Sequence, residues 1–254
     1  MNIDVRRESR SRHQDPIARV GIRLPIAGLT PMTTLDHPDH LACVVFLQGC
    51  PLRCGYCHNP QMLPSRRGKR EEWEKILKFL ENRRGLLDSV VFSGGEPTTH
   101  ADLVAAMKDA KALGFKVGLH TAGVYPRRLE TLLPWLDWVG FDVKGHVDDF
   151  EHIAGRLGTW PRHAQSLGLL LDSNIDLECR TTIHWRDFDL KAVERLALSL
   201  ADCGVRRYAL QLARTEQCLA SAYAEPVVDA PLPEELARLV KRLAPRFDQL
   251  TLRE

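Results

Sequence analysis

Three cysteines near the start of the chain, Cys50, Cys54 and Cys57, have the spacing C-x3-C-x2-C. Glycine and proline residues around them interrupt regular structure, which predicts a tight loop. Thiolates bind soft metals, and three of them on one short loop leave one coordination position of a metal centre free. We therefore interpret these cysteines as ligands of a 4Fe–4S cluster whose fourth iron is open to another ligand.

Two other uses of the same thiols have to be considered. His58 could complete a Cys3His site for structural zinc. Disulfide bonds are a further option, but the chain holds seven cysteines, an odd number, and no apolar signal segment begins it. No second ligand pair at zinc spacing follows, so the open cluster is the favoured hypothesis and zinc is the alternative.

A strand must carry this loop. Residues 43–47 form an apolar, β-branched run of the kind that is buried on both faces of a parallel sheet. The cysteines directly follow its carboxyl end, which is where α/β folds bind their ligands.

The remainder of the chain alternates between strand and helix patterns. Strands are expected at residues 89–92, 115–119, 138–143, 177–183 and 207–212, and helices at 71–84, 102–113, 127–133, 161–171, 189–201 and 233–243. With residues 43–47 these elements make six β–α units, which predicts a parallel sheet. Right-handed crossovers would curl it into an α/β fold with an open partial (β/α)6 barrel.

We expect one domain. Residues 1–15 are polar and predict a disordered tail, and residues 16–254 form the domain, with strands or a hairpin at 17–36 and the barrel core at 42–243. The net charge of +2 gives no argument for nucleic acid or a membrane as a partner, and no apolar run is long enough to span a bilayer. The expected location is the reducing cytoplasm.

Polar residues follow the other predicted strands. Because the carboxyl ends of parallel strands meet at one edge of a sheet, these side chains should gather beside the cysteine loop. They are Gly94, Gly95 and Glu96 after the second strand, His120 and Thr121 at the third, Asp142 and Lys144 at the fourth, Arg180 on the fifth and Gln211 on the sixth.

Each of these residues also has a purely structural interpretation. The segment GGEP can be an ordinary turn, and His120 a satisfied polar residue at a strand end. Asp142 and Lys144, two residues apart in an extended chain, point to the same face and can form a structural ion pair. Arg180 can form a salt bridge between strands.

The motifs FLQGCPLRCGYCHNP and FSGGEP resemble the radical S-adenosylmethionine (SAM) superfamily, and most closely its glycyl-radical-enzyme activases. The segments GLTPMTTLDHPDH, LHTAG and FDVKG are similar to the activating proteins of anaerobic ribonucleoside-triphosphate reductase. The resemblance extends over residues 22–212. LHTAG departs from the Asp-Thr-Asn of pyruvate formate-lyase activases, which removes the Asp that a monovalent-cation site would use.

The resemblance implies a role for each of these residues. Cys50, Cys54 and Cys57 would hold three irons, and the amino and carboxylate groups of SAM would chelate the fourth. SAM would also contact Tyr56, Cys57 and His58 near the adenine, Gly94, Gly95 and Glu96 at the amino group, His120, Thr121 and Arg180 at the carboxylate or ribose, Asp142 and Lys144 at the ribose and carboxylate, and Gln211.

The implied activity is reductive cleavage of SAM to methionine and a 5′-deoxyadenosyl radical, with no catalytic side chain beyond the cluster and SAM. The radical would remove hydrogen from a glycine of a partner, expected to be anaerobic ribonucleotide reductase, with a flavodoxin- or ferredoxin-type electron donor. No cysteine lies within residues 58–92, so one cluster is expected. The alternatives are an activase of pyruvate formate-lyase type, a small-molecule enzyme such as a 7-carboxy-7-deazaguanine synthase, and a zinc-binding interaction module.

Overall fold

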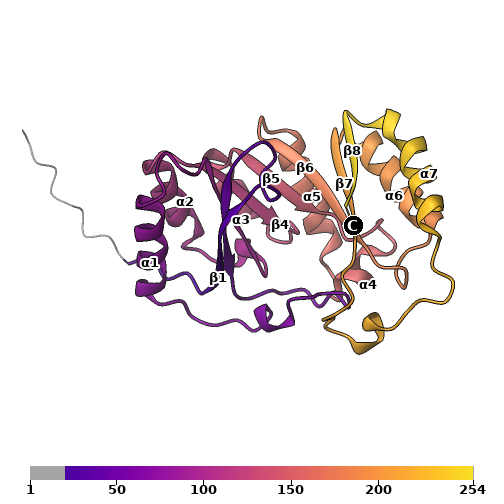
Figure 1. Cartoon of the computed structure of the whole chain (residues 1–254), viewed down its shortest axis with the longest axis horizontal. Helices are drawn as coiled ribbons and strands as arrows, with labels where there is room; N and C mark the ends of the chain where they lie inside the picture. The colour runs from indigo at the N-terminus through magenta and orange to yellow at the C-terminus, as the bar shows by residue number, and fades with distance from the viewer. Residues whose placement is uncertain (1–20, 254) are drawn as a thin grey trace, which may run out of the picture.

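One sheet of eight strands organises the molecule (Figure 1). The computed structural model describes residues 21–253, so the tail expected at residues 1–15 lies outside the described residues. The strands follow one another in the sheet in the order of the sequence. They are β1 (Ile26–Thr33), β2 (Ala42–Leu47), β3 (Ser89–Gly94), β4 (Lys116–Thr121), β5 (Trp138–Asp142), β6 (Asp176–Ile183), β7 (Arg207–Leu212) and β8 (Gln249–Arg253).

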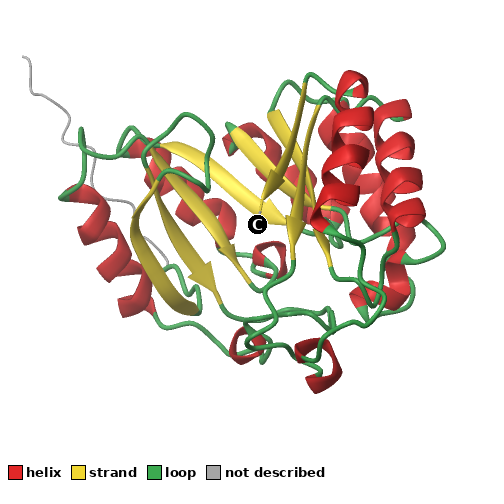
Figure 2. Cartoon of the chain, turned by 45° about the vertical axis from the view of Figure 1, so that its right-hand side comes forward, coloured by secondary structure: helices red, strands yellow, loops and turns green. Residues whose placement is uncertain are grey.

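The strand pairing makes the sheet an open barrel. β1 is antiparallel to β2, and every later pair of neighbours is parallel. β1 and β8 stand at opposite ends of the strand order and, in the described part of the chain, do not pair with each other. The predicted α/β partial barrel is therefore confirmed, and Figure 2 shows its sheet curving between the helices.

Within residues 21–253, seven α-helices connect these strands. They are α1 (Arg70–Glu81), α2 (Leu103–Ala112), α3 (Pro126–Leu132), α4 (Phe150–Ala154), α5 (Trp160–Leu171), α6 (Leu190–Asp202) and α7 (Pro233–Leu243). In α1 the buried residues Trp73, Ile76 and Leu80 recur every three or four positions, so the helix buries one stripe against the sheet. No helix within residues 21–253 is both long and apolar enough to cross a membrane.

The period of two along β2 separates the two faces of the sheet. Cys43, Val45 and Leu47 join the main core with the helices. Ala42 and Val44 point to the opposite face, where they form a small cluster with Val91 and Trp138. The inner face of the barrel therefore carries only a small apolar cluster, which leaves room for the polar side chains described below.

Two elements were not predicted from the sequence. α4 has five residues, too few to display a helical period, and it ends at Gly155 in the left-handed region with φ of 62°. β8 is an edge strand whose partner β7 lies some forty positions earlier, so its pairing with β7 creates it. The sheet consequently has a seventh parallel strand in addition to the predicted six.

The expected hairpin at residues 17–36 lies partly outside the described residues. Its described part contains one strand, β1, and this strand pairs with β2 of the barrel core and not with a second strand among residues 21–36. This eight-residue antiparallel strand closes one side of the core, and its other edge is free within the described sheet.

Candidate active site

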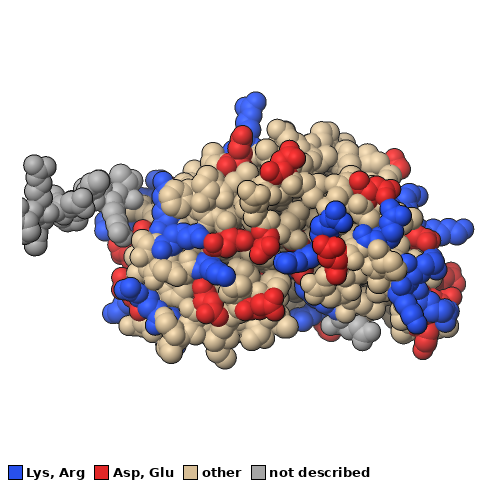
Figure 3. Space-filling model, turned by 90° about the horizontal axis from the view of Figure 1, so that it is seen from above, with Lys and Arg blue, Asp and Glu red and all other residues tan. Residues whose placement is uncertain are grey.

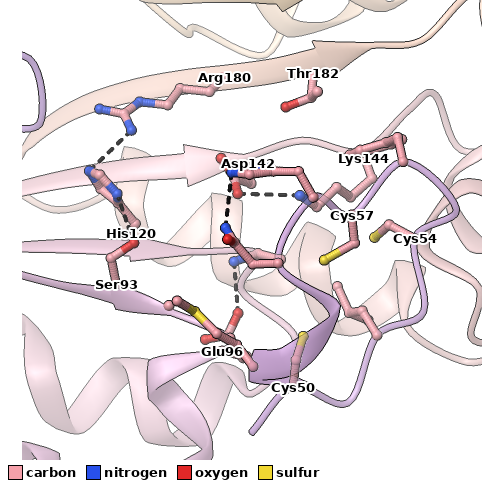
Figure 4. A pocket seen from close by; sticks show the side chains of 18 of the residues that line it. Cys50, Cys54, Cys57, Ser93, Glu96, His120, Asp142, Lys144, Arg180 and Thr182 are labelled. Atoms are coloured by element: carbon pink, nitrogen blue, oxygen red, sulfur yellow. Dashed lines mark hydrogen bonds and ion pairs between the residues drawn. The ribbon is translucent and has the colours of Figure 1, made fainter. Parts of the chain in front are cut away.

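A cavity of about 500 Å³ lies at the carboxyl ends of the parallel strands (Figure 4). Its lining comes from the loop after β2 and from the ends of β3 to β7. Every residue selected from the sequence lines it: Cys50, Cys54, Tyr56, Cys57, His58, Gly94, Gly95, Glu96, His120, Thr121, Asp142, Lys144, Arg180 and Gln211. The fold thus brings together residues from six separate segments of the chain.

The cysteine loop, residues 48–59, is held by main-chain hydrogen bonds. The N–H of Gly49 donates to Met62 O at 2.7 Å, and the N–H of Cys50 donates to Leu63 O at 3.1 Å. The guanidinium of Arg53 donates to the carbonyl of Cys50 at 2.9 Å. These bonds fix the loop independently of any ligand in the cavity.

The three thiols are free and share one space. None of them forms a disulfide, and Figure 4 shows their sulfur atoms directed into the cavity. Burial raises the pKa of Cys50 to about 12 and also raises the pKa of Cys54, so both thiols keep their protons at neutral pH. A metal binds the thiolate, so its binding here would release protons.

The donor set fits a cluster. Within residues 21–253, no three His, Cys, Asp or Glu side chains gather closely enough to ligate one ion. A 4Fe–4S cluster takes one cysteine on each iron, so its ligands need not share an ion. Three free cysteines on one loop beside a polar cavity match that requirement.

Glu96 follows β3 and is fully buried, with 1% of its surface exposed. Its carboxylate accepts from the N–H of Thr98 at 3.1 Å, the hydroxyl of Thr98 at 2.5 Å, the hydroxyl of Thr121 at 2.7 Å and the N–H of Ala122 at 2.8 Å. Burial raises the pKa of Glu96, and these four donors act against that rise. Groups of the protein itself therefore already donate to both oxygens of the Glu96 carboxylate. The contact of Glu96 with the ammonium group of SAM stays a prediction.

Gly94 and Gly95 allow the end of β3 to lie against the cysteine loop. Gly94 has φ of 111°, and a Cβ there would lie 2.3 Å from the carbonyl oxygen of Leu47. A Cβ on Gly95 would lie 2.3 Å from the carbonyl oxygen of Gly49. Because both approaches are to main-chain oxygen, only glycine fits at either position.

Asp142 and Lys144 form a charged pair at the end of β5, with Nζ 3.2 Å from Oδ2. Burial acts to raise the pKa of Asp142, but the charges of Lys144 and Arg180 outweigh it and hold that pKa below its usual value. Burial likewise opposes the charge on Lys144, but Asp142 raises the pKa of Lys144 well above its usual value. The cavity therefore offers a carboxylate for hydroxyl groups and an ammonium for an anion.

Tyr56 lies in the wall of the cavity, beside Lys144. Its side chain is 6% exposed, and Nζ of Lys144 is 5.8 Å from the centre of its ring. The ring therefore lies next to the ammonium group of Lys144, while the neighbouring Cys57 and His58 are more exposed.

His120 and Arg180 meet across the inner face of the sheet. Nη1 of Arg180 lies 3.1 Å from Nε2 of His120, and Nδ1 of His120 lies 3.1 Å from Oγ of Ser93. Burial and the charge of Arg180 lower the pKa of His120 to about 3, so the ring is neutral. Nε2 also lies 3.1 Å from the carbonyl oxygen of Asp36. Arginine can only donate and a carbonyl oxygen can only accept, so the tautomer of the neutral ring decides which of these two neighbours Nε2 pairs with.

Arg180 is also held on its own strand. Its Nε donates to Oε1 of Glu178 at 2.7 Å, and its guanidinium lies 4.8 Å from the ring centre of Trp138. The Nη2 atom is buried and has no hydrogen-bond partner in the described part of the protein. This buried donor is therefore left without a partner among the described residues, although other atoms of Arg180 line the cavity.

Ser93, Thr182 and Asp36 also line the cavity and were not selected from the sequence. Thr182 lies two residues after Arg180 on the same face of β6, which is a signal that the sequence carried. Ser93 directly precedes the glycine pair. Asp36 comes from the loop between β1 and β2, and its carbonyl oxygen lies 3.1 Å from Nε2 of His120, a contact that no sequence pattern indicates.

The comparisons with known proteins agree in one family. A model of the Radical SAM superfamily matches residues 44–185. A putative glycyl-radical enzyme activating enzyme of Methanocaldococcus jannaschii is 31% identical over 239 residues, which cover 90% of this chain and 95% of that protein.

Two further similarities are more limited. The pyruvate formate-lyase-activating enzyme of Clostridium pasteurianum is 37% identical over 129 residues, 49% of this chain and 53% of that protein. Streptococcus suis SuiB, solved with its precursor peptide SuiA, matches with a TM-score of 0.63 at 15% identity over 82% of this chain and 48% of its own. The structural likeness shows a shared fold.

Proposed function

The chain belongs to the radical SAM superfamily and, within it, to the glycyl-radical-enzyme activating enzymes, and we propose that its target is a glycine of an anaerobic ribonucleoside-triphosphate reductase. One observation carries the proposal for the site. Polar side chains from the ends of β3, β4, β5, β6 and β7 line a single cavity with three free cysteines. Chance placement would scatter them over both ends of the sheet.

The cysteines Cys50, Cys54 and Cys57 would hold the one cluster. A bound cluster would supply the electron that cleaves a carbon–sulfur bond of SAM, chemistry that would end in removal of a hydrogen atom from the target glycine. This chemistry requires no acid–base side chain. The role of the chain is to orient SAM and to exclude water.

The polar side chains divide the binding of SAM between them. Lys144 and Arg180, which both line the cavity, supply positive charge for the carboxylate of the methionyl group. Asp142 supplies an ionised carboxylate for the ribose hydroxyls. Neutral His120, whose ring nitrogens already contact Ser93, Arg180 and Asp36, lines the cavity without adding charge beside the sulfonium.

The open side of the barrel supports a protein substrate. β1 and β8 are not paired with each other in the described sheet, so a loop of another protein could reach the cavity between them. The similarity of GLTPMTTLDHPDH to reductase activating proteins favours the reductase as partner. The activity also needs a one-electron donor, which we propose is a flavodoxin- or ferredoxin-type protein of the cytoplasm.

A second candidate partner has equal support. The similarity to the pyruvate formate-lyase-activating enzyme of Clostridium pasteurianum favours a glycyl radical enzyme of that type. Both candidates predict the same site chemistry and differ only in the loop that enters the barrel.

The deciding experiment uses anaerobically reconstituted, reduced protein with SAM and either candidate partner. We expect iron uptake, release of 5′-deoxyadenosine and a glycyl radical doublet in the electron paramagnetic resonance spectrum with one partner. Cys54→Ser should abolish all three, whereas the matched control Cys203→Ser, at an exposed cysteine, should abolish none. SAM cleavage without a doublet would refute both partners, turnover of a small molecule alone would favour the small-molecule alternative, and absent iron uptake would refute the cluster.

A further inference from the structure

A segment between β7 and α7 covers the outer side of the cysteine loop. We call residues 213–232 the strap; it contains the short helix η4 (Ser221–Ala224). The N–H of Ala220 donates to the carbonyl of Gly55 at 3.1 Å. A Cβ added to Gly55 would lie 2.3 Å from Cε2 of Tyr223, so the tyrosine ring rests directly on this glycine.

Tyr223 is fixed from the other side by the loop after β6. Its hydroxyl donates to Oδ1 of Asp187 at 2.6 Å, and its ring centre lies 4.6 Å from that of His184. Nδ1 of His184 accepts from the N–H of Arg186, so Nε2 donates to the carbonyl of Tyr223 at 3.0 Å. Burial and the adjacent Asp187 raise the pKa of Tyr223, so the hydroxyl keeps the proton that it donates.

These residues stand outside the cavity. Tyr223, Asp187 and His184 are absent from its lining, whereas Cys54, Tyr56 and Cys57, which flank Gly55, are part of it. Gly55 has no positive φ, so the tyrosine ring, rather than the local backbone, is what requires a glycine there. Tyr223 therefore contacts the cysteine loop from outside the cavity. The contact is at Gly55, which is one residue from Cys54 and two residues from Cys57.

We propose that Tyr223, anchored by Asp187, is a positioning residue that holds the Cys54–Cys57 half of the loop in place and shields the cluster from water and oxygen. The proposal rests on the proposed function, because it takes the three cysteines as cluster ligands. Reduction adds negative charge to a cluster, and water stabilises that charge. Removal of the cover should therefore shift the reduction potential to a more positive value and speed oxidative loss.

The test compares Tyr223→Ala, Tyr223→Phe and Asp187→Ala with the matched control Tyr125→Ala. Tyr125 precedes α3, away from the strap, and its ring contacts Arg128. In air, the visible absorbance of the reconstituted cluster should decay several-fold faster in Tyr223→Ala, and the potential should become more positive. Tyr223→Phe, which keeps the ring, should lie between this variant and the wild type. Equal decay and potential in Tyr223→Ala and Tyr125→Ala would overturn the proposal.

A double-mutant cycle tests the contact itself. Gly55→Ala should shorten the cluster lifetime in the wild-type background and have no further effect in Tyr223→Ala, because the ring that opposes the added methyl is gone. Equal effects in both backgrounds would refute the contact.

Hydrogen exchange separates this proposal from the proposed function. In the metal-free chain, Tyr223→Ala should increase exchange at residues 54–57 and in the strap but leave α5 unchanged. If the wild type takes up no iron, the proposed function fails, while this exchange measurement still decides whether the strap holds the loop. Unchanged exchange at residues 54–57 would overturn the inference.

Discussion

At the scale of single residues, the carboxylate of Glu96 joins the loop after β3 to the end of β4. It accepts hydrogen bonds from Thr98, Thr121 and Ala122, two of them from main-chain N–H groups. A buried carboxylate needs such donors in place of water. Glu96 therefore stabilises the wall of the cavity whatever it contributes to ligand binding.

Glu96→Gln should lower the free energy of unfolding by about 2 kcal/mol, because an amide NH2 replaces one acceptor and faces donors that are left unpaired. The measurement is urea denaturation of the metal-free protein. The matched control Glu130→Gln, at an exposed position on α3, should change stability by less than about 0.5 kcal/mol. Equal stability of the two variants would contradict the four hydrogen bonds.

At the scale of elements, two segments around the cavity are supported by residues that do not line it. α5 supports the chain after β4: Nδ1 of His163 donates to the carbonyl of Ala122 at 2.8 Å, and Oγ of Ser166 donates to the carbonyl of Gly123 at 2.6 Å. The strap supports the cysteine loop in the same way through Tyr223. Helices and loops outside the cavity thus set the positions of the groups inside it.

A pair of glycine substitutions tests the contact between β3 and the cysteine loop. Gly95→Ala should destabilise the protein and reduce iron uptake, because the new methyl meets the carbonyl oxygen of Gly49. Gly168→Ala, inside α5 with open space around it, should raise stability by about 0.5–1 kcal/mol. Thermal unfolding and iron content measure both effects. Stabilisation by Gly95→Ala would show that the two loops are further apart than described.

At the scale of the whole molecule, charge is distributed in two ways. On the surface, Lys and Arg are interspersed with Asp and Glu, as Figure 3 shows for one face, in keeping with the net charge of +2. On the inner face of the sheet, a charged row runs from the edge strand to the site. Arg253 of β8 contacts Glu178 at 2.8 Å, and Glu178 holds Arg180. The edge strand β8 therefore helps to position a cavity residue.

Stability should fall in acid because desolvation lowers the pKa of several histidines in the folded protein, three of them to values far below the ordinary one. Burial lowers the pKa of His37 and His163 to about 4 and of His120 to about 3, all below the ordinary 6.5. Below pH 6.5 the unfolded chain therefore binds more protons than the folded one, so stability is complete above that pH and is lost as the pH falls toward 4. Each histidine contributes a slope of at most about 1.4 kcal/mol per pH unit.

Urea denaturation of the metal-free protein between pH 7 and pH 4.5 measures this effect. His163→Gln should reduce the proton uptake on unfolding by about one, because it removes one titrating ring. A free energy of unfolding that stays constant from pH 7 to pH 5 would contradict the buried, neutral state of these histidines.

Sequence alone predicted the parts of the fold that local patterns specify. The apolar run at residues 43–47 gave β2, and the expected strand at residues 207–212 coincides with β7. The residues proposed for the site line one cavity because they follow strands, and parallel strands place all their carboxyl ends at one edge of a sheet. That rule needs only the order of the elements, so it held for Cys50 as well as for Gln211.

The tertiary structure alone decided the contacts between segments that are far apart in the chain. Four such contacts are the hydrogen bonds from Thr121 and Ala122 to Glu96, the approach of Asp36 to His120, the pairing that makes β8, and the packing of Tyr223 on Gly55. They have no local signal, because each depends on a partner from another part of the chain. The residue types and their spacing determined which chemistry the chain can support. The packing of distant segments determined which of those side chains are free for a ligand and which already hold the protein together, since a buried polar group must find its partner wherever the fold places one.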